Sequence, residues 1–406
     1  MDEQVQQLIQ KETERQENTL DLIASENICS SDVRAALSSP FVNKYAEGYP
    51  GKRYYAGNQV IDELELLCQK RAQELFHTDY HVNVQPYSGS PANLAIYAAL
   101  LEPGDSILSM DLAQGGHLTH GSPVNWSGKF YDFHFYGVNK ETEEIDYVEV
   151  DKLAQEIKPK MIVCGTTAYP QQVDFGQFAG IAKRVGALLL ADISHVAGLI
   201  VGGVHRSPFP HADVVMTTTH KTLRGPRGAI ILCKHDYASQ IDRAVFPGMQ
   251  GGPHEHTIAA KAVAFGEANT KEFRHYARQI SINARTLADA FIESPLRVVS
   301  GGTDTHLVLI DITQTGIGGK LAQDRLEEVG IICNRNLIPY DQKPPQDPSG
   351  LRLGTASLTT RGMGEDEMKI LANLIIQTLS DKADLNKIKS QVLDLAHRFP
   401  IEVKKR

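Results

Sequence analysis

Cysteine is scarce in this sequence, and the cysteines that occur are far apart. The 406 residues include 5 cysteines, and no two of them form a CxxC pair or show the spacing of a metal site. An odd number of widely spaced cysteines argues against a disulfide-stapled scaffold. We therefore expect reduced, mostly buried thiols and no metal centre, as in a cytoplasmic protein.

Positive charge is also in short supply. Lysine and arginine number 41 against 49 aspartates and glutamates, which gives a formal net charge of -8. Nucleic acids and anionic membrane surfaces attract basic faces, so we expect neither as a partner. The first residues, MDEQVQQLIQKETERQ, lack the apolar core of a signal peptide. The most apolar stretch, 186–203, carries Asp192 and His195 near its centre, which argues against a membrane span.

Two common nucleotide-binding signatures are missing as well. No GxxxxGK[ST] loop occurs, because Gly318-Gly319-Lys320 lacks both the earlier glycine and the following hydroxyl residue. No GxGxxG opens a helix after the first expected strand. A phosphate-loop enzyme and a dinucleotide-binding fold are therefore unsupported.

Short apolar runs alternate with helical patterns from about residue 60 to 235, which predicts an α/β domain with a mostly parallel sheet. The expected strands are 81–86, 106–110, 131–136, 161–165, 187–192, 213–217 and 228–233. The expected helices between them include 61–76, 91–101 and 178–185. The flanking elements are an exposed polar helix or arm at 1–18, a long helix at 257–291, strands of a second sheet at 305–312, 330–333 and 351–355, and a helix at 365–379.

Polar residues follow several expected strands, which is where open α/β sheets bind ligands. Lys221 comes after one strand, beside His220 and a run of threonines, where a lysine that reacts through its neutral amine could be partly desolvated. Asp192 and His195 follow a fully apolar strand. Asp192 could simply cap a helix, or it could pair with a protonated heterocycle nitrogen. A divalent metal site is weaker, because a third ligand at usable spacing is missing.

Three further segments add to this pattern. Ser88-Gly89-Ser90 precedes an expected helix and is either an anion site or an ordinary helix start. His117 lies in a glycine-rich loop, where it could stack on a flat cofactor or stay on the surface. Arg352, in a late strand, could hold a carboxylate through two parallel hydrogen bonds. Together these residues specify a pyridoxal phosphate enzyme of the aspartate-aminotransferase-like fold.

Segments along nearly the whole chain resemble the serine hydroxymethyltransferase family. They are LIASEN (22–27), KYAEGYPGKRYYAG (44–57), VQPYSGS (84–90), GGHLTHGSPVN (115–125), DISHVAGL (192–199), TTTHKTLRGPRG (217–228), FPGMQGGP (246–253), GGTDTHL (301–307) and LRLGTASLTTRG (351–362). The resemblance implies an α/β fold type I enzyme with a large mixed-sheet domain and a small C-terminal α+β domain. The implied reaction is the reversible transfer of the serine hydroxymethyl group to tetrahydrofolate, giving glycine and 5,10-methylenetetrahydrofolate.

The resemblance also implies the setting of the enzyme. It would be a cytoplasmic transferase of one-carbon metabolism and amino-acid biosynthesis, with pyridoxal 5'-phosphate as cofactor and serine, glycine and tetrahydrofolate as small-molecule partners. It would form a homodimer with shared active sites, or a tetramer built from such dimers. The expected domains are an N-terminal arm with active-site loops (1–56), a large cofactor domain (57–280) and a small C-terminal domain (281–406).

Site residues are carried over from the matching motifs. The implied catalytic residues are Lys221, which would bind the cofactor covalently, Glu47, His220, Tyr55 and Thr218. The implied cofactor-binding residues are Ser88, Gly89, Ser90, His117, Thr167, Asp192, His195 and Lys221, with Tyr45, Gly251 and Gly252 contributed by the neighbouring subunit. The implied amino-acid site consists of Ser25, Tyr55, Arg352 and Glu47. The implied folate site consists of Leu112, Gly116, Leu118, Asn336 and Tyr54.

The chain departs from the family pattern at a few positions. Pro91 stands where glutamine usually follows SGS, but proline suits a first helical turn. Thr167 replaces the usual serine that would contact the ring oxygen and keeps the hydroxyl group. Gln114 replaces a frequent histidine before GGH, and the loop around 344–346 lacks the common SPF-like run. Backbone contacts to folate from this loop are therefore the weakest part of the comparison.

Other functions on the same scaffold stay open from the residues alone. A folate-independent β-hydroxy amino acid aldolase would not need Glu47 and Tyr55, which belong to the folate-facing half of the site. An α-methylserine hydroxymethyltransferase is not excluded by any single residue. A cofactor-free or RNA-binding relative is disfavoured, because Lys221, Asp192 and Arg352 are all retained and the chain is acidic.

Overall fold

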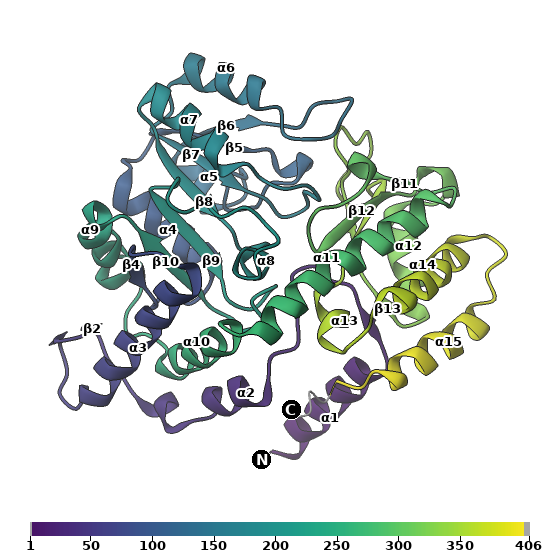
Figure 1. Cartoon of the computed structure of the whole chain (residues 1–406), viewed down its shortest axis with the longest axis horizontal. Coiled ribbons are helices and arrows are strands. Elements are labelled where there is room, and N and C mark those ends of the chain that lie inside the picture. The colour runs from purple at the N-terminus through teal and green to yellow at the C-terminus, as the bar shows by residue number, and fades with distance from the viewer. Residues whose placement is uncertain (1, 402–406) are drawn as a thin grey trace. The chain divides into compact units, whose positions relative to one another are not determined.

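The computed structural model describes residues 2–401, which fold into two compact units (Figure 1). One unit consists of Cys29–Ala277. The other combines the N-terminal segment through Ile28 with the chain from Arg278 onward. The three-part domain division expected from the sequence stays a prediction.

A seven-stranded mixed sheet forms the centre of the unit 29–277. Its strands, in spatial order, are β4 (His81–Asn83), β10 (Ala229–Cys233), β9 (Val214–Thr218), β8 (Leu188–Asp192), β7 (Met161–Gly165), β5 (Ser106–Met110) and β6 (Asp132–Tyr136), and they follow one another across the teal part of Figure 1. The strands from β9 to β6 are parallel, and β10 runs antiparallel to both of its neighbours. The sequence prediction of a mostly parallel sheet is confirmed.

The central strands are continuous apolar runs because helices cover the sheet. All five residues of β7, β9 and β10 are buried. The predicted strands match the observed ones to within one residue, except that β4 ends at Asn83 instead of continuing to Pro86. Beyond Asn83 the side-chain Oδ1 of that residue accepts a hydrogen bond from Gln85 N, and Pro86 has no N–H to extend the ladder.

Helices surround this sheet. They are α2 (Ser31–Leu37), α3 (Gln59–Phe76), α4 (Gly89–Leu100), α5 (Trp126–Phe130), α6 (Tyr147–Ile157), α7 (Phe175–Val185), α8 (Ala197–Val201), α9 (Ala238–Arg243) and α10 (Glu255–Ala268), with shorter helical turns η1 (Pro40–Asn43), η2 (Leu112–Gln114), η3 (His235–Tyr237) and η4 (Ala244–Met249). Apolar side chains of α4 and α9 join those of the strands in one buried cluster. The α7 helix starts three residues earlier than predicted because Asp174 caps it, accepting a hydrogen bond from Gln177 N at 3.1 Å.

The prediction of one long helix at 257–291 is wrong, because the chain forms α10 and then α11 (Lys271–Ile292). The hydroxyl of Thr270 donates to Glu267 O at 2.8 Å and accepts from Phe273 N at 3.2 Å. The Thr270 side chain thus bonds a backbone carbonyl at the end of α10 and a backbone N–H at the beginning of α11. The apolar periodicity continues across this break, which is why it predicts a single helix.

The other unit contains a four-stranded antiparallel sheet in the order β11 (Arg297–Val298), β12 (Leu307–Asp311), β15 (Gly350–Gly354) and β14 (Asn334–Asn336). Its helices are α1 (Glu3–Glu17), α12 (Gly319–Glu328), α13 (Ala356–Thr360), α14 (Glu365–Leu379) and α15 (Leu385–Arg398), with short turns η5 (Val299–Gly301) and η6 (Thr313–Thr315). A buried cluster that includes residues of β12, β15, α12, α14 and α15 forms its core. The exposed α1 helix confirms the polar N-terminal helix that the sequence predicts.

The segment 330–333 does not belong to this sheet, contrary to prediction. Its strand β13 (Ile331–Ile332) pairs in parallel with β1 (Leu20–Asp21). Leu20 N donates to Gly330 O at 2.8 Å, and Leu22 N donates to Ile332 O at 2.7 Å. The backbone of β13 therefore pairs with the N-terminal segment. The residues that follow it, strand β14, join the four-stranded sheet instead.

Candidate active site

The carboxylate of Asp192 lies at the end of β8 and is surrounded by donors. Its Oδ2 accepts from Asn93 Nδ2 at 3.0 Å and lies 3.1 Å from His120 Nε2. Its Oδ1 accepts from Ser194 N at 3.1 Å and from Ser194 Oγ at 2.6 Å. Asn93 comes from α4 and His120 from the loop after β5, so two separate elements orient this one carboxylate.

These neighbours keep Asp192 ionised. Burial by itself raises the pKa of the carboxyl group, but the hydrogen bond and charge of His120, the charge of His117 and the bond from Ser194 together lower it well below its usual range. The residue is 8% exposed, so the ionised carboxylate can still meet a ligand. A buried carboxylate that stays ionised is the partner that a protonated pyridine nitrogen needs.

Lys221 follows the neighbouring strand, β9, and is buried. Two contacts tie the end of β9 to the loop after Asp192. Thr218 N donates to Ser194 Oγ at 3.1 Å. Thr222 Oγ1 donates to His195 O at 2.8 Å and accepts from Gly198 N at 3.0 Å. The carboxyl ends of β8 and β9 are adjacent in the sheet, so Asp192 and the loop of Lys221 come from neighbouring strand ends.

His220 is neutral in this environment. Burial, and then the charges of Lys221 and Arg227, lower its pKa to about 3. Its Nδ1 atom is buried and has no hydrogen-bond partner among the residues that the structure describes.

The segment Ser88-Gly89-Ser90, which the sequence predicts as an anion site, forms the beginning of α4. Ser88 is the N-cap residue, and Gly89, Ser90 and Pro91 form the first turn, as the sequence predicts for proline. A Cβ atom on Gly89 would lie 2.8 Å from Thr218 Cγ2, so only glycine allows this close approach of α4 to β9. The N–H groups of a helix start suit a phosphate group.

The glycine-rich loop after β5 lies beside this site. His117 Nδ1 contacts Thr119 Oγ1 at 2.7 Å, and Thr119 Oγ1 in turn accepts from Asn93 Nδ2 at 2.9 Å. This chain of bonds links the predicted ring-stacking histidine to the residues around Asp192. Thr167 N donates to Gly115 O at 2.7 Å. Thr167, which is predicted to contact the ring oxygen of the cofactor, therefore lies beside the same loop.

Glu47, Tyr45 and Tyr55 form a second cluster in the unit 29–277. The rings of Tyr45 and Tyr55 meet edge to face, with centroids 5.7 Å apart. The charge of Glu47 is the main cause that raises the pKa of Tyr55. Cβ atoms built on Gly251 and Gly252 would lie 3.5 Å from Glu47 Oε1 and 3.0 Å from the Tyr45 ring. Segments about 200 residues apart in the sequence therefore form one cluster of residues that the family resemblance assigns to the active site.

The segments that carry Ser25 and Arg352 lie against each other in the other unit. Gly354 N donates to Leu22 O at 2.7 Å, and a Cβ atom on Gly354 would lie 2.4 Å from Ala24 Cα. The turn that carries Ser25 thus lies against the strand that carries Arg352. Arg352 Nε donates to Asn334 Oδ1 at 3.1 Å, and burial lowers the pKa of this guanidinium to about 10.

Four of the five predicted folate residues occupy exposed or edge positions, whereas Gly116 is buried, and a Cβ atom on it would lie 2.2 Å from Met110 O. Leu112, Leu118 and Tyr54 are 43%, 47% and 73% exposed, although large apolar side chains usually avoid water. Asn336 ends the edge strand β14. Gln114, one of the departures from the family pattern, has a structural contact, because its Oε1 accepts from Val138 N at 2.9 Å.

Sequence reasoning missed the residues that hold Asp192 in place. Asn93, His120 and Ser194 all bond its carboxylate, and Thr222 joins the two loops. Ser194 could have been found, since a hydroxyl two residues after an aspartate often bonds it. His120 and Asn93 carry no local signal, because only the packing of α4 against the sheet brings them near.

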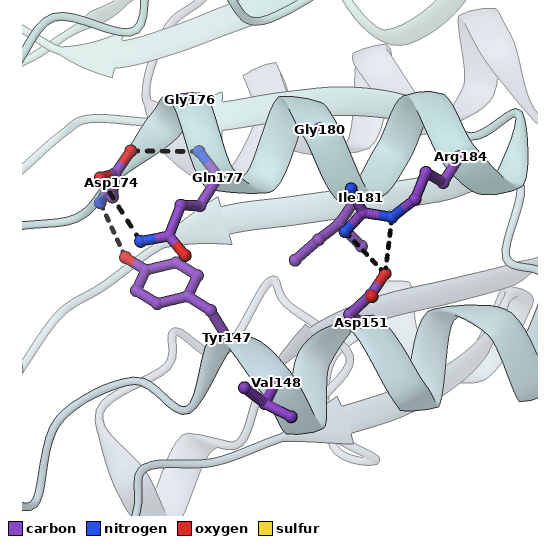
Figure 2. A pocket seen from close by; sticks show the side chains of 9 residues that line it. All are labelled: Tyr147, Val148, Asp151, Asp174, Gly176, Gln177, Gly180, Ile181 and Arg184. Atoms are coloured by element: carbon purple, nitrogen blue, oxygen red, sulfur yellow. Dashed lines mark hydrogen bonds and ion pairs between the residues drawn. The ribbon is translucent and has the colours of Figure 1, made fainter.

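A separate surface pocket of about 610 Å³ lies between α6 and α7 (Figure 2). Tyr147 and Asp174 lie near one end of it, where Asp174 N donates to the tyrosine hydroxyl at 2.7 Å. Arg184 and Asp151 form an ion pair of 2.9 Å near the other end. None of the site residues predicted from the sequence lines this pocket, so it is distinct from the candidate active site.

Among residues 2–401, no group of three or more histidine, cysteine, aspartate or glutamate side chains could hold a metal ion. Not one of the described helices combines the length and the apolar character that a bilayer span requires. Within the described chain Cys68, Cys164, Cys233 and Cys333 are buried, Cys29 is partly buried, and all five thiols are free.

The mixed sheet, the ionised aspartate at the end of one strand, the lysine after the next and the glycine-containing start of α4 are the features of a fold type I pyridoxal phosphate enzyme. The family model for serine hydroxymethyltransferase matches residues 1–375. A serine hydroxymethyltransferase of Coprothermobacter proteolyticus is 53% identical over 401 residues, covering 98% of this chain and 96% of the relative. The chain belongs to the serine hydroxymethyltransferase family. It is a transferase that uses pyridoxal phosphate to move the hydroxymethyl group of serine to tetrahydrofolate.

Proposed function

We propose that the residues at the carboxyl ends of β8 and β9 bind pyridoxal phosphate, with Lys221 as its covalent attachment point. The observation that carries this proposal is the fourfold hydrogen-bonded, ionised carboxylate of Asp192 beside the loop of Lys221. Asp192 would hold the proton on the pyridine nitrogen. When bound, the cofactor would accept the electron pair left on the α-carbon as the bond to the hydroxymethyl group breaks.

We assign the remaining cofactor contacts to residues around the same strand ends. Ser88, Gly89 and Ser90 would hold the phosphate at the start of α4. His117 would cover one face of the ring, fixed by its contact with Thr119. His195 and Thr167 would lie toward the phenolic oxygen. Thr218 and the neutral His220 would border the amine of Lys221.

We assign the amino-acid substrate to Arg352, Ser25, Tyr55 and Glu47. The buried guanidinium of Arg352 stays protonated at neutral pH, since its pKa of about 10 is still well above 7, and it would bind the α-carboxylate. Binding at that point fixes which bond of the α-carbon breaks, because the carboxylate sets the orientation of the substrate. Glu47 would carry a proton to or from the hydroxymethyl oxygen, with the Tyr55 hydroxyl as its neighbour.

Tetrahydrofolate would bind to the exposed apolar surface of Leu112, Leu118 and Tyr54, with Gly116 and Asn336 beside it. Exposed apolar side chains on a flexible loop can cover a flat pterin or aminobenzoate ring without a large rearrangement. The loop at 344–346 would add backbone contacts. Its sequence departs from the family pattern, so these contacts would have their own geometry.

A homodimer with shared sites would explain the exposed cluster around Glu47. Tyr45, Tyr54 and Tyr55 are 57%, 73% and 50% exposed, and such a group of exposed aromatic rings is typical of a surface that a partner covers. Tyr45, Gly251 and Gly252 would complete the phosphate site of the neighbouring subunit. We expect the enzyme to act in the cytoplasm.

Replacing Lys221 tests the proposal directly. Lys221→Ala should keep the fold but lose the visible absorbance of the lysine-bound cofactor and most turnover of serine with tetrahydrofolate. Turnover at the wild-type rate would show that another group fills this role. Lys234→Ala is a matched control, because Lys234 pairs with Asp213 at the other end of β9.

A further inference from the structure

The side chain of Arg53 makes hydrogen bonds to the backbone on both sides of Glu47. Arg53 lies in β3 (Lys52–Arg53), which pairs with β2 (Gly48–Tyr49) in a short hairpin directly after Glu47. Its Nη1 donates to Ala46 O at 3.1 Å and to Gly48 O at 2.8 Å. The guanidinium therefore bonds the carbonyl groups of the two residues on either side of Glu47.

Two carboxylates of α3 hold this guanidinium in turn. Arg53 Nε donates to Asp62 Oδ1 at 2.8 Å, and Nη2 donates to Glu65 Oε1 at 2.7 Å. The side chains of Arg53 and Glu65 are 4% and 0% exposed, so water screens this pair poorly. Asp62 also accepts from Gly51 N at 2.9 Å, which fixes the turn of the hairpin.

A second donor reaches the same backbone position. Gln85 Nε2 donates to Gly48 O at 2.9 Å and to Glu65 Oε2 at 3.1 Å. Gln85 comes just before the phosphate loop that begins α4. Gly48 O thus accepts from two buried side chains, and both of these are bonded to the same glutamate.

We propose that Arg53 is a positioning residue for Glu47 in the hydroxymethyl transfer, held in place by Asp62, Glu65 and Gln85. This inference rests on the proposed role of Glu47 in proton transfer. Lysine cannot replace arginine here, because a single ammonium group cannot reach two carbonyls and two carboxylates in a fixed planar arrangement. A proton-transfer group must stay within hydrogen-bond reach of its substrate, so loosening its backbone slows the reaction without removing any group that touches substrate.

Arg53→Lys is the first test. We expect kcat for serine with tetrahydrofolate to fall roughly tenfold to a hundredfold, as a misplaced catalytic group typically causes. The affinity for pyridoxal phosphate should stay within about twofold, since the hydrogen bonds of the Arg53 side chain within the described chain go to Ala46, Gly48, Asp62 and Glu65, none of them assigned to the cofactor. Arg71→Lys is the matched control, because Arg71 lies on α3, the helix that carries Asp62 and Glu65, and likewise donates to a backbone carbonyl, Ala262 O, at 2.6 Å; it should keep wild-type kcat. Parallel losses of kcat and cofactor affinity in Arg53→Lys would overturn the proposal.

A double-mutant cycle with Glu47→Gln separates this proposal from the one on which it rests. If Arg53 acts through Glu47, Arg53→Lys should cost little further kcat once Glu47 is already glutamine. If Glu47→Gln lowers kcat and Arg53→Lys lowers it again by its full factor, the positioning role is wrong while the role of Glu47 stands. If Glu47→Gln keeps wild-type kcat, the proposed role of Glu47 is wrong, and the positioning role falls with it.

Gln85→Met keeps the test decisive if Arg53→Lys does not fold. This change removes one of the two donors to Gly48 O and leaves the Arg53 ion pairs in place. We expect a smaller loss of kcat, again absent in the Glu47→Gln background. A loss of the same size in both backgrounds, or no loss in the wild-type background, would overturn the proposal.

Discussion

Glu255, the first residue of α10, is a buried carboxyl group whose titration should make the protein less stable as pH rises. The residue is 0% exposed, and neither carboxyl oxygen accepts a hydrogen bond from any residue in the described chain. The charged groups that face it are Glu65, Arg53 and Lys261. Burial, and then the charge of Glu65, raise its pKa to about 8, despite the two cations.

The sign of the effect follows from proton counting. In the unfolded chain this carboxyl group ionises near its ordinary pKa of 4.5, whereas in the folded protein it keeps its proton up to about pH 8. Between these values the folded state binds more protons, so the free energy of unfolding falls as pH rises. The full difference would be roughly 4–5 kcal/mol at 1.36 kcal/mol per pKa unit. Because Glu65 and Glu255 titrate as a coupled pair, we expect the measured loss in the free energy of unfolding to be about half of this difference, ~2 kcal/mol.

Glu255→Gln should remove this loss, because an amide stays neutral and can donate to Glu65. We expect the variant and the wild type to have similar free energies of unfolding at pH 5, and the variant to be ~2 kcal/mol more stable at pH 8. Urea denaturation at fixed protein concentration measures both values. A stability difference that is the same at both pH values would refute the reasoning.

Two further predictions concern the substrates and the assembly. Arg352→Ala should weaken serine and glycine binding far more than pyridoxal phosphate binding, because the guanidinium would pair with the α-carboxylate; titration of each ligand measures this, and equal losses would contradict the assignment. Mixing Lys221→Ala and Glu47→Gln subunits in equal amounts, after dissociation and reassembly, should raise activity above that of either variant alone, to about a quarter of the wild-type value, if each site takes Lys221 from one copy and Glu47 from the other. Half of the dimers would then be mixed, each with one site free of both substitutions. No recovery would show that each chain carries a complete site.

The elements that the sequence predicts best are those whose burial depends on one continuous apolar run. The strands β5 and β7 and the helix α14 have the predicted bounds, since each buries a run that no other arrangement would bury as well. The errors occur where a distant segment or a single hydroxyl decides the outcome. Thr270 splits a helix that its periodicity would continue, and the N-terminal segment draws β13 away from the second sheet.

The same distinction applies to the candidate site. Asp192 and Lys221 can be picked out in the sequence because one ends an apolar strand and the other lies three residues after one, and ligands of parallel sheets bind at these strand ends. His120 and Asn93, which orient Asp192, lie on a loop and a helix that only the folded chain brings together. In the sequence KRYYAG, Arg53 looks like an ordinary surface charge. Its side chain is nevertheless only 4% exposed and is hydrogen-bonded to carboxylate and backbone carbonyl groups.

Covalent labelling tests the central claim most directly. Borohydride reduction of the protein incubated with pyridoxal phosphate, followed by peptide mass mapping, identifies the lysine that carries the cofactor. The account predicts a single stable label on Lys221 and no label in Lys221→Ala. A label on another lysine of the wild type, such as Lys234, with Lys221 unmodified, would contradict the account.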